Sequence, residues 1–160
     1  MASITTTQGA DPLSIEPGTV LVADAEKEGF TEILFDGRHG LLADEPVHLG
    51  GRDTGPSPYD LLLMSLGACT AMTLRLYASR KAWPLQRVLV RLRHRKIHAE
   101  DCATCETEKG FVDSIERRIE LLGPLTTEQR DRLLEVADLC PIHRTLMSEV
   151  TIDTALAETA

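Results

Sequence analysis

Residues 55–70 read Gly-Pro-Ser-Pro-Tyr-Asp-Leu-Leu-Leu-Met-Ser-Leu-Gly-Ala-Cys-Thr, and this stretch decides the fold. Ser57 suits a helix N-cap, Pro58 suits the first helical position, and Asp60 can bond back to the cap. The pattern predicts a helix from Pro58 to about Arg80. Few polar residues interrupt it before Arg75, so most of its circumference is apolar and we expect a buried helix with Cys69 at its middle.

Short strands are expected before this helix. Residues 20–23 and 30–35 have strand composition, and Asp36-Gly37 before residues 38–43 is a hairpin signal, because glycine accepts the positive φ of a tight turn. A loop rich in Gly, Asp and Pro occupies residues 44–57.

Two long strands are expected after it. Apolar residues alternate with charged ones near residues 88–92 and again near 115–121. If these strands pair as a hairpin, the loop of residues 102–110 joins them and facing Arg and Glu side chains lie on the solvent side.

The C-terminal third holds a second capping box, Thr126 to Gln129, which opens an amphipathic helix. Pro141 disturbs that helix, because the residue before a proline is pushed away from helical angles. A short helix of about residues 141–147 can then begin with Cys140 at its N-cap. Alternation of Val150, Ile152 and Thr154 predicts a last strand.

The bulk composition limits the class of protein. A chain of 160 residues with 42% hydrophobic content fits one domain, predicted over residues 19–155 after a flexible arm of residues 1–18. A net charge of -8 argues against nucleic acid as a partner. We also expect no membrane association and a cytoplasmic location, where cysteines serve as metal ligands or redox groups.

The cysteines allow two interpretations. Peroxide reduction needs a thiolate, an electropositive setting and a second thiol that captures the sulfenic acid. Cys140 meets one condition, because a helix N-terminus favours an anion. Spacing alone favours the other interpretation, in which Cys69 and Cys140 are small buried apolar residues.

A family resemblance changes that balance. Residues 55–70, followed by Cys140-Pro-Ile-His143, resemble the OsmC/Ohr family of hydroperoxide reductases over about residues 30–154. The chain most resembles the OsmC-like domain that is sometimes fused to an α/β-hydrolase, through residues 43–46, 50–51 and 72–75. The resemblance implies an α+β fold, with a curved antiparallel sheet around a long buried helix, and an intertwined homodimer.

The resemblance also implies the chemistry. Cys69 would attack an organic hydroperoxide, Cys140 would resolve the sulfenic acid as a disulfide, and an external dithiol would recycle it without a cofactor. Arg38 best matches the family's active-site arginine, Arg52 is the competitor, and either can be an ordinary turn arginine. Tyr59 stands where the family often has Glu, so Asp60 either supplies that carboxylate or only completes the capping box.

A second group of residues, His94, His98, Cys102 and Cys105, suits a zinc site, an auxiliary dithiol or a plain polar loop. The histidines stand about 13 Å apart on a straight strand, so we expect a plain loop and no metal. A thiol redox sensor or small-molecule binding module on the same fold is the alternative function, and a zinc-binding protein comes third.

Overall fold

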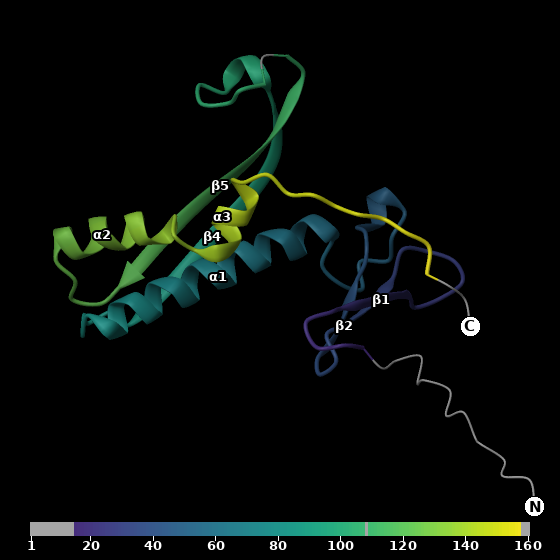
Figure 1. Ribbon diagram of the computed structural model, residues 1–160, viewed down its shortest axis with the longest axis horizontal. Coiled ribbons are helices and arrows are strands. Elements are labelled where there is room, and N and C mark those ends of the chain that lie inside the picture. The colour runs from purple at the N-terminus through teal and green to yellow at the C-terminus, as the bar shows by residue number, and fades with distance from the viewer. Residues whose placement is uncertain (1–14, 108, 158–160) are drawn as a thin grey trace, which may run out of the picture. The chain divides into compact units, whose positions relative to one another are not determined.

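The computed structural model describes residues 15–107 and 109–157 and divides into two compact units, residues 1–61 and 62–160 (Figure 1). Each unit is described by itself. Most of the predicted arm, residues 1–14, lies outside the described residues. The single domain of residues 19–155 stays a prediction.

The first unit is an antiparallel three-stranded sheet. It contains β1 (Leu21–Asp24), β2 (Glu32–Phe35) and β3 (Gly40–Ala43), in that spatial order. The expected Asp-Gly turn joins β2 to β3, with Gly37 at a φ of 89°. The Asp36 carboxylate accepts the backbone N–H of Arg38 at 2.8 Å and of His39 at 2.6 Å, which stabilises the turn.

Asp44 organises the loop that follows β3 and contains the 3₁₀ turn η1 (Val47–Leu49). Its carboxylate is buried and accepts backbone N–H groups of Glu45, Arg52 and Thr54. The hydroxyls of Thr31 and Thr54 donate to it as well. Burial by itself would raise the pKa of Asp44, but these donors outweigh it and lower the pKa to about 2.

Helix α1 (Pro58–Arg80) has the predicted bounds and the predicted cap. The Ser57 hydroxyl accepts the Asp60 N–H at 3.2 Å, and the Asp60 carboxylate accepts the Ser57 N–H at 3.1 Å. Its length and hydropathy would also suit a membrane span, but core helices of soluble proteins pass the same test.

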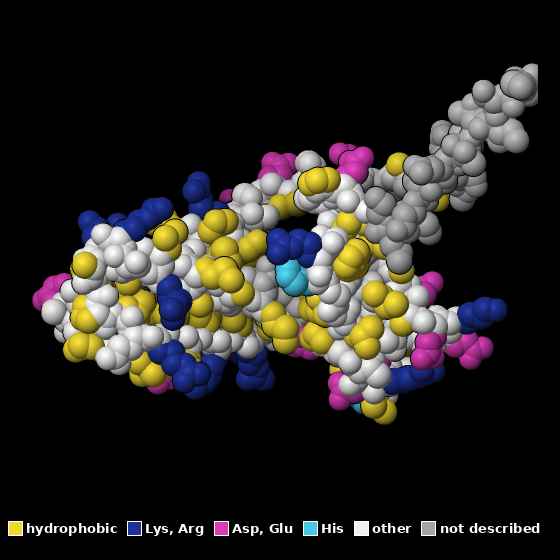
Figure 2. All heavy atoms as spheres, turned by 90° about the horizontal axis from the view of Figure 1, so that it is seen from below, with side chains coloured by type: hydrophobic (Ala, Val, Ile, Leu, Met, Phe, Trp, Pro, Cys, Tyr) yellow, Lys and Arg dark blue, Asp and Glu magenta, His cyan; other side chains and the backbone are white. Residues whose placement is uncertain are grey.

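In the chain alone α1 is buried along one face only, which is less than the buried helix that its composition predicts. The buried residues recur every four positions: Leu66, Thr70, Leu74 and Ala78. Met64, Met72 and Leu76 are exposed, and Figure 2 shows hydrophobic side chains gathered over the surface near this helix. A single hairpin can cover only one side of a helix, so the other apolar side remains open.

The predicted long hairpin consists of β4 (Arg87–His98) and β5 (Phe111–Leu122), paired from Arg87↔Leu122 to His98↔Phe111. The turn η2 (Ala99–Asp101) lies at its tip. Arg91 and Glu120 form an exposed ion pair at 3.1 Å, as expected for the solvent face. Gly67 lets α1 approach the other face, because a Cβ there would lie 2.9 Å from Leu92.

Helix α2 (Thr127–Ala137) begins at the predicted capping box, in which Thr126 and Gln129 bond each other's backbone N–H groups. Helix α3 (Pro141–Leu146) begins directly after Cys140, as predicted. Together α1, α2 and β5 enclose the core: Leu74, Ala78, Leu121, Leu133, Val136 and Ala137. The α+β class with antiparallel sheets is thereby confirmed.

The predicted strand at residues 150–154 is wrong. This segment has no regular secondary structure and pairs with no strand among the residues that the structure describes. Alternating side chains indicate a strand only where another strand offers its backbone donors and acceptors.

Candidate functional site: a paired thiol

The structure brings Cys69 and Cys140 together in the second unit. Cys69 lies in the middle of α1, and Cys140 is the N-cap of α3. Both are free thiols, and each sulfur is close enough to alter the pKa of the other. Cys140 is fully buried whereas Cys69 is half-buried, so a dissolved molecule reaches Cys69 first.

Local backbone bonds fix Cys140 between its two helices. Its N–H donates to the carbonyl of Ala137 at 3.3 Å, and its carbonyl accepts the N–H of Arg144 at 3.1 Å. Pro141 occupies the first turn of α3, where its missing N–H costs no helical bond. The residue before this proline is therefore fixed with its side chain at the helix start.

The two thiols have opposite pKa shifts. Burial is the largest cause and raises the pKa of Cys69. The N–H of Ile142 lowers this pKa, and the neighbouring Cys140 raises it again, so that the net shift is upward. Burial alone would raise the pKa of Cys140 too, but the Cys69 thiol, the His143 N–H and the Thr70 hydroxyl outweigh it and lower the pKa. The two shifts therefore favour ionisation of Cys140 over ionisation of Cys69.

The backbone at the start of α3 also favours a Cys140 thiolate. The Cys140 sulfur makes no capping hydrogen bond of standard geometry. The N–H groups of Ile142 and His143 nevertheless favour its thiolate, as expected for unpaired donors at a helix start.

An open hollow of about 380 Å³ lies beside Cys69. Only Ser65 and Thr73 among its lining residues carry a hydroxyl, and the Thr73 hydroxyl is bonded to the Cys69 carbonyl at 2.8 Å. The remaining lining is apolar or sulfur-bearing: Ala68, Cys69, Met72, Leu76, Pro141 and Ile142. The hollow suits a molecule with an apolar body and one polar end.

Arg117 is a residue of this site that the sequence reasoning missed. Its Nη1 donates to the Thr70 hydroxyl at 3.1 Å and to the Ala137 carbonyl at 3.2 Å, and its Nη2 donates to Asp138 at 2.6 Å. Its side chain is only 13% exposed. The sequence did contain a signal for this role. Arg117 lies two residues from both Ile115 and Ile119, so it shares their apolar face of the strand, where a charged side chain is unexpected.

The two arginines selected from the sequence lie in the first unit. Arg38 is in the turn between β2 and β3, and its role toward Cys69 stays a prediction. Arg52 pairs with Glu26 at 2.6 Å. Asp60 completes the helix cap, and its role as the carboxylate partner of the arginine stays a prediction.

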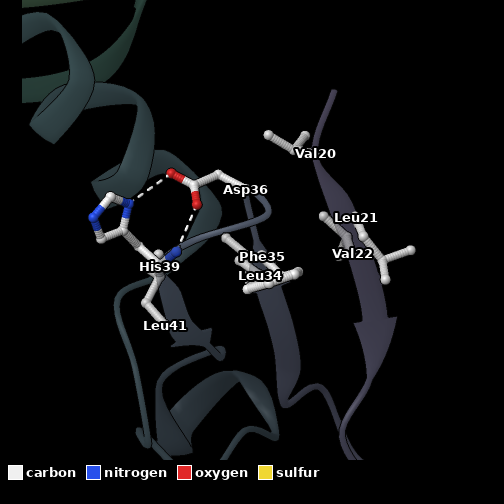
Figure 3. A pocket seen from close by; sticks show the side chains of 8 residues that line it. All are labelled: Val20, Leu21, Val22, Leu34, Phe35, Asp36, His39 and Leu41. Atoms are coloured by element: carbon white, nitrogen blue, oxygen red, sulfur yellow. Dashed lines mark hydrogen bonds and ion pairs between the residues drawn. The ribbon is translucent and has the colours of Figure 1, made fainter. Parts of the chain in front are cut away.

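The first unit also holds an apolar pocket of about 180 Å³, on the sheet beside the β2–β3 turn (Figure 3). Asp36 and His39 line the pocket at the β2–β3 turn, and their side chains pair at 2.9 Å. Hydrogen bonds from His39 and from the Arg38 N–H lower the pKa of Asp36. The other lining residues are apolar: Val20, Leu21, Val22, Leu34, Phe35 and Leu41. This lining contains no thiol, so the cysteine pair remains the candidate centre for redox chemistry.

The loop at the hairpin tip is cross-linked, which corrects the expected plain loop. Cys102 and Cys105 form a disulfide with Cα atoms 5.5 Å apart, a separation typical of such bonds. His94 lies 2.8 Å from Asp113, and His98 stacks on Phe111. Over residues 15–107 and 109–157, no three His, Cys, Asp or Glu side chains group as metal ligands.

Comparison with known proteins gives a family and a fold. The family model described as "OsmC-like protein" matches residues 51–155. An OsmC-like protein from Mycoplasma pneumoniae is similar in structure, with 20% identity, a TM-score of 0.61, and coverage of 81% of this chain and 86% of that one. No curated protein matches the chain in sequence.

Two further solved structures carry a functional name. An organic hydroperoxide resistance protein OsmC from Legionella pneumophila is 22% identical, with a TM-score of 0.57 and coverage of 80% and 88% of the two chains. An organic hydroperoxide resistance protein from Elizabethkingia anophelis, solved with thiocyanate, is 18% identical, with a TM-score of 0.56 and coverage of 79% and 84%. At these identities the similarity establishes the shared fold.

Proposed function

This chain belongs to the OsmC-like protein family, and from that premise we propose that it is a two-cysteine thiol peroxidase that reduces organic hydroperoxides. The observation that carries the proposal is the arrangement of the pair, with Cys69 at an apolar hollow and Cys140 buried beside it. The names of the Legionella and Elizabethkingia proteins point to the same chemistry.

The first step oxidises Cys69. Because the pKa of Cys69 is raised and that of Cys140 is lowered, the step begins when a Cys140 thiolate takes the Cys69 proton. The Cys69 thiolate then attacks the outer peroxide oxygen, the O–O bond breaks, and Cys69 becomes a sulfenic acid. The leaving alkoxide takes the proton back from Cys140 and departs as an alcohol, so Cys140 is again a thiolate.

The second step closes the disulfide. The Cys140 thiolate attacks the Cys69 sulfur, and the hydroxyl of the sulfenic acid leaves as water after taking up a proton. An external dithiol then reduces the Cys69–Cys140 disulfide by two exchange reactions and becomes a disulfide itself. A lowered pKa at Cys140 supports this role, since the resolving sulfur must be ionised when it attacks.

We also propose that the chain works as a homodimer. The exposed apolar side of α1 continues beyond the hollow to Met64, and this part is a surface that a second copy would cover. Sedimentation of the purified protein at micromolar concentration tests this, with twice the mass of one chain expected and a single chain contradicting it.

Steady-state peroxide consumption tests the enzymatic proposal. With excess dithiol, the wild type should consume many equivalents of tert-butyl hydroperoxide per chain, whereas Cys69→Ser should consume none. Without dithiol, Cys140→Ser should stop after about one equivalent if Cys69 is trapped as a sulfenic acid, or after about two if a second peroxide over-oxidises it to a sulfinic acid. A wild-type protein that itself stops after one equivalent would instead be a redox sensor, and equal turnover in Cys69→Ser would refute the mechanism.

A further inference from the structure

The guanidinium of Arg117 joins the two backbone segments that carry the cysteines. Thr70, which it bonds at 3.1 Å, directly follows Cys69 on α1. The Ala137 carbonyl, which it bonds at 3.2 Å, also accepts the Cys140 N–H. One side chain from β5 therefore links the helix of the first sulfur to the turn that holds the second.

The Thr70 hydroxyl is oriented by this contact. Arginine can only donate, so the Thr70 oxygen accepts from Arg117 and its single proton is left for another acceptor. The Leu66 carbonyl, 2.8 Å away, accepts this proton, and the same hydroxyl lowers the pKa of the neighbouring Cys140. Thr70 and Cys140 are both fully buried, so solvent does not compete for this proton.

We propose that Arg117, acting through Thr70, is a positioning residue that keeps Cys140 beside Cys69 and keeps the Thr70 hydroxyl beside the Cys140 sulfur. The inference rests on the proposed function, because it assigns a role within the same site. Arg117 does not reach the peroxide in this scheme. It supplies, from inside the second unit, a cation that holds the turn at Ala137 and Asp138 and polarises the Thr70 hydroxyl.

A structural role alone would predict a different behaviour. If Arg117 only tied β5 to α2 through Asp138, its loss would lower stability and leave the ionisation of the thiols unchanged. Removing the hydroxyl of Thr70 would then affect nothing but packing. The ionisation of the thiol pair therefore separates the two roles.

The experiment is a pH titration of thiolate absorbance, without peroxide, in full-length protein carrying Cys102→Ser and Cys105→Ser so that only the site thiols titrate. Thr70→Val and Arg117→Met should each move the first ionisation to higher pH and reduce the thiolate present at neutral pH by about tenfold, as expected for a lost bond to a charged group. Arg117→Lys should restore part of the loss, and the double variant should add little, because both residues act through one contact. Arg91→Met removes an exposed arginine from the same hairpin and should titrate like the parent.

If the thiols of Thr70→Val and Arg117→Met ionise at the same pH as those of the parent protein, the inference is wrong. If Arg117→Met does not fold, Thr70→Val decides alone, because exchanging a hydroxyl for a methyl keeps the side-chain shape. The assay contains no peroxide, so a shifted titration in a protein without turnover would support the role of Arg117 while refuting the peroxidase proposal.

Discussion

The apolar hollow beside Cys69 predicts a preference for bulky hydroperoxides over hydrogen peroxide. The perturbation is chemical: tert-butyl hydroperoxide carries a four-carbon group where hydrogen peroxide has a proton. The hollow of about 380 Å³ has room for this group against Met72, Leu76 and Ile142. Both peroxides present the same outer oxygen to Cys69, so a difference between their rates reports the contacts of the tert-butyl group with the hollow.

The magnitude follows from burial. Complete transfer of four carbons from water contributes about 3 kcal/mol, at about 0.8 kcal/mol for each carbon, and corresponds to roughly 100-fold in kcat/KM. The hollow is open on one side, so we expect about half of this burial, which corresponds to a roughly tenfold difference in kcat/KM. We therefore expect kcat/KM for tert-butyl hydroperoxide to exceed that for hydrogen peroxide by about 10- to 100-fold.

The assay measures both rates in the same preparation and divides each by the rate of a free small thiolate with that peroxide. Leu76→Asn, which makes the lining polar at similar volume, should lower the ratio toward one. Leu134→Asn, an exposed change on α2 outside the lining, should leave the ratio unchanged. A ratio near one in the wild type, or an equal ratio in Leu76→Asn, would refute the assignment of this hollow as the peroxide site.

Three further results are expected. Cys69→Ala should raise the pKa of Cys140, because the thiol that lowers it is gone; an unchanged pH dependence of Cys140 alkylation would contradict this. The Asp44 pKa lies near 2 in the fold and ordinarily at 3.8, so its carboxylate stabilises the fold above about pH 4, and this contribution is lost as the pH falls through 2. The Tm difference between wild type and Asp44→Asn should therefore shrink from pH 5 to pH 2, and a constant difference would count against it. Leu74→Ala, at a fully buried position, should lower the free energy of unfolding by about 2–5 kcal/mol in urea titrations, whereas the exposed change Arg75→Ala should stay within about 0.5 kcal/mol.

Local signals made much of the fold predictable. The capping boxes at Ser57 and Thr126 involve residues three apart, so the sequence contains both partners of each hydrogen bond. The same holds for the Asp36-Gly37 turn, and for Cys140 before Pro141. These elements formed where the residues predicted them.

Features that depend on distant partners were not predictable in the same way. Residues 150–154 alternate like a strand but pair with none in the described part of the chain. Arg117 acts through Thr70, forty-seven positions earlier, so its role emerged only with the fold. The pairing of Cys69 with Cys140 came from the family resemblance, because spacing alone favoured two inert buried residues.

The most direct test of the central claim is peptide mapping of the disulfides after mild oxidation. The wild-type protein is first fully reduced, treated with one equivalent of tert-butyl hydroperoxide, alkylated, and digested without reductant. We expect an intramolecular peptide pair linking Cys69 to Cys140, at a yield close to the peroxide added. A digest in which Cys69 and Cys140 are both alkylated, and only Cys102 and Cys105 are linked, would contradict the claim that Cys69 and Cys140 are the redox pair.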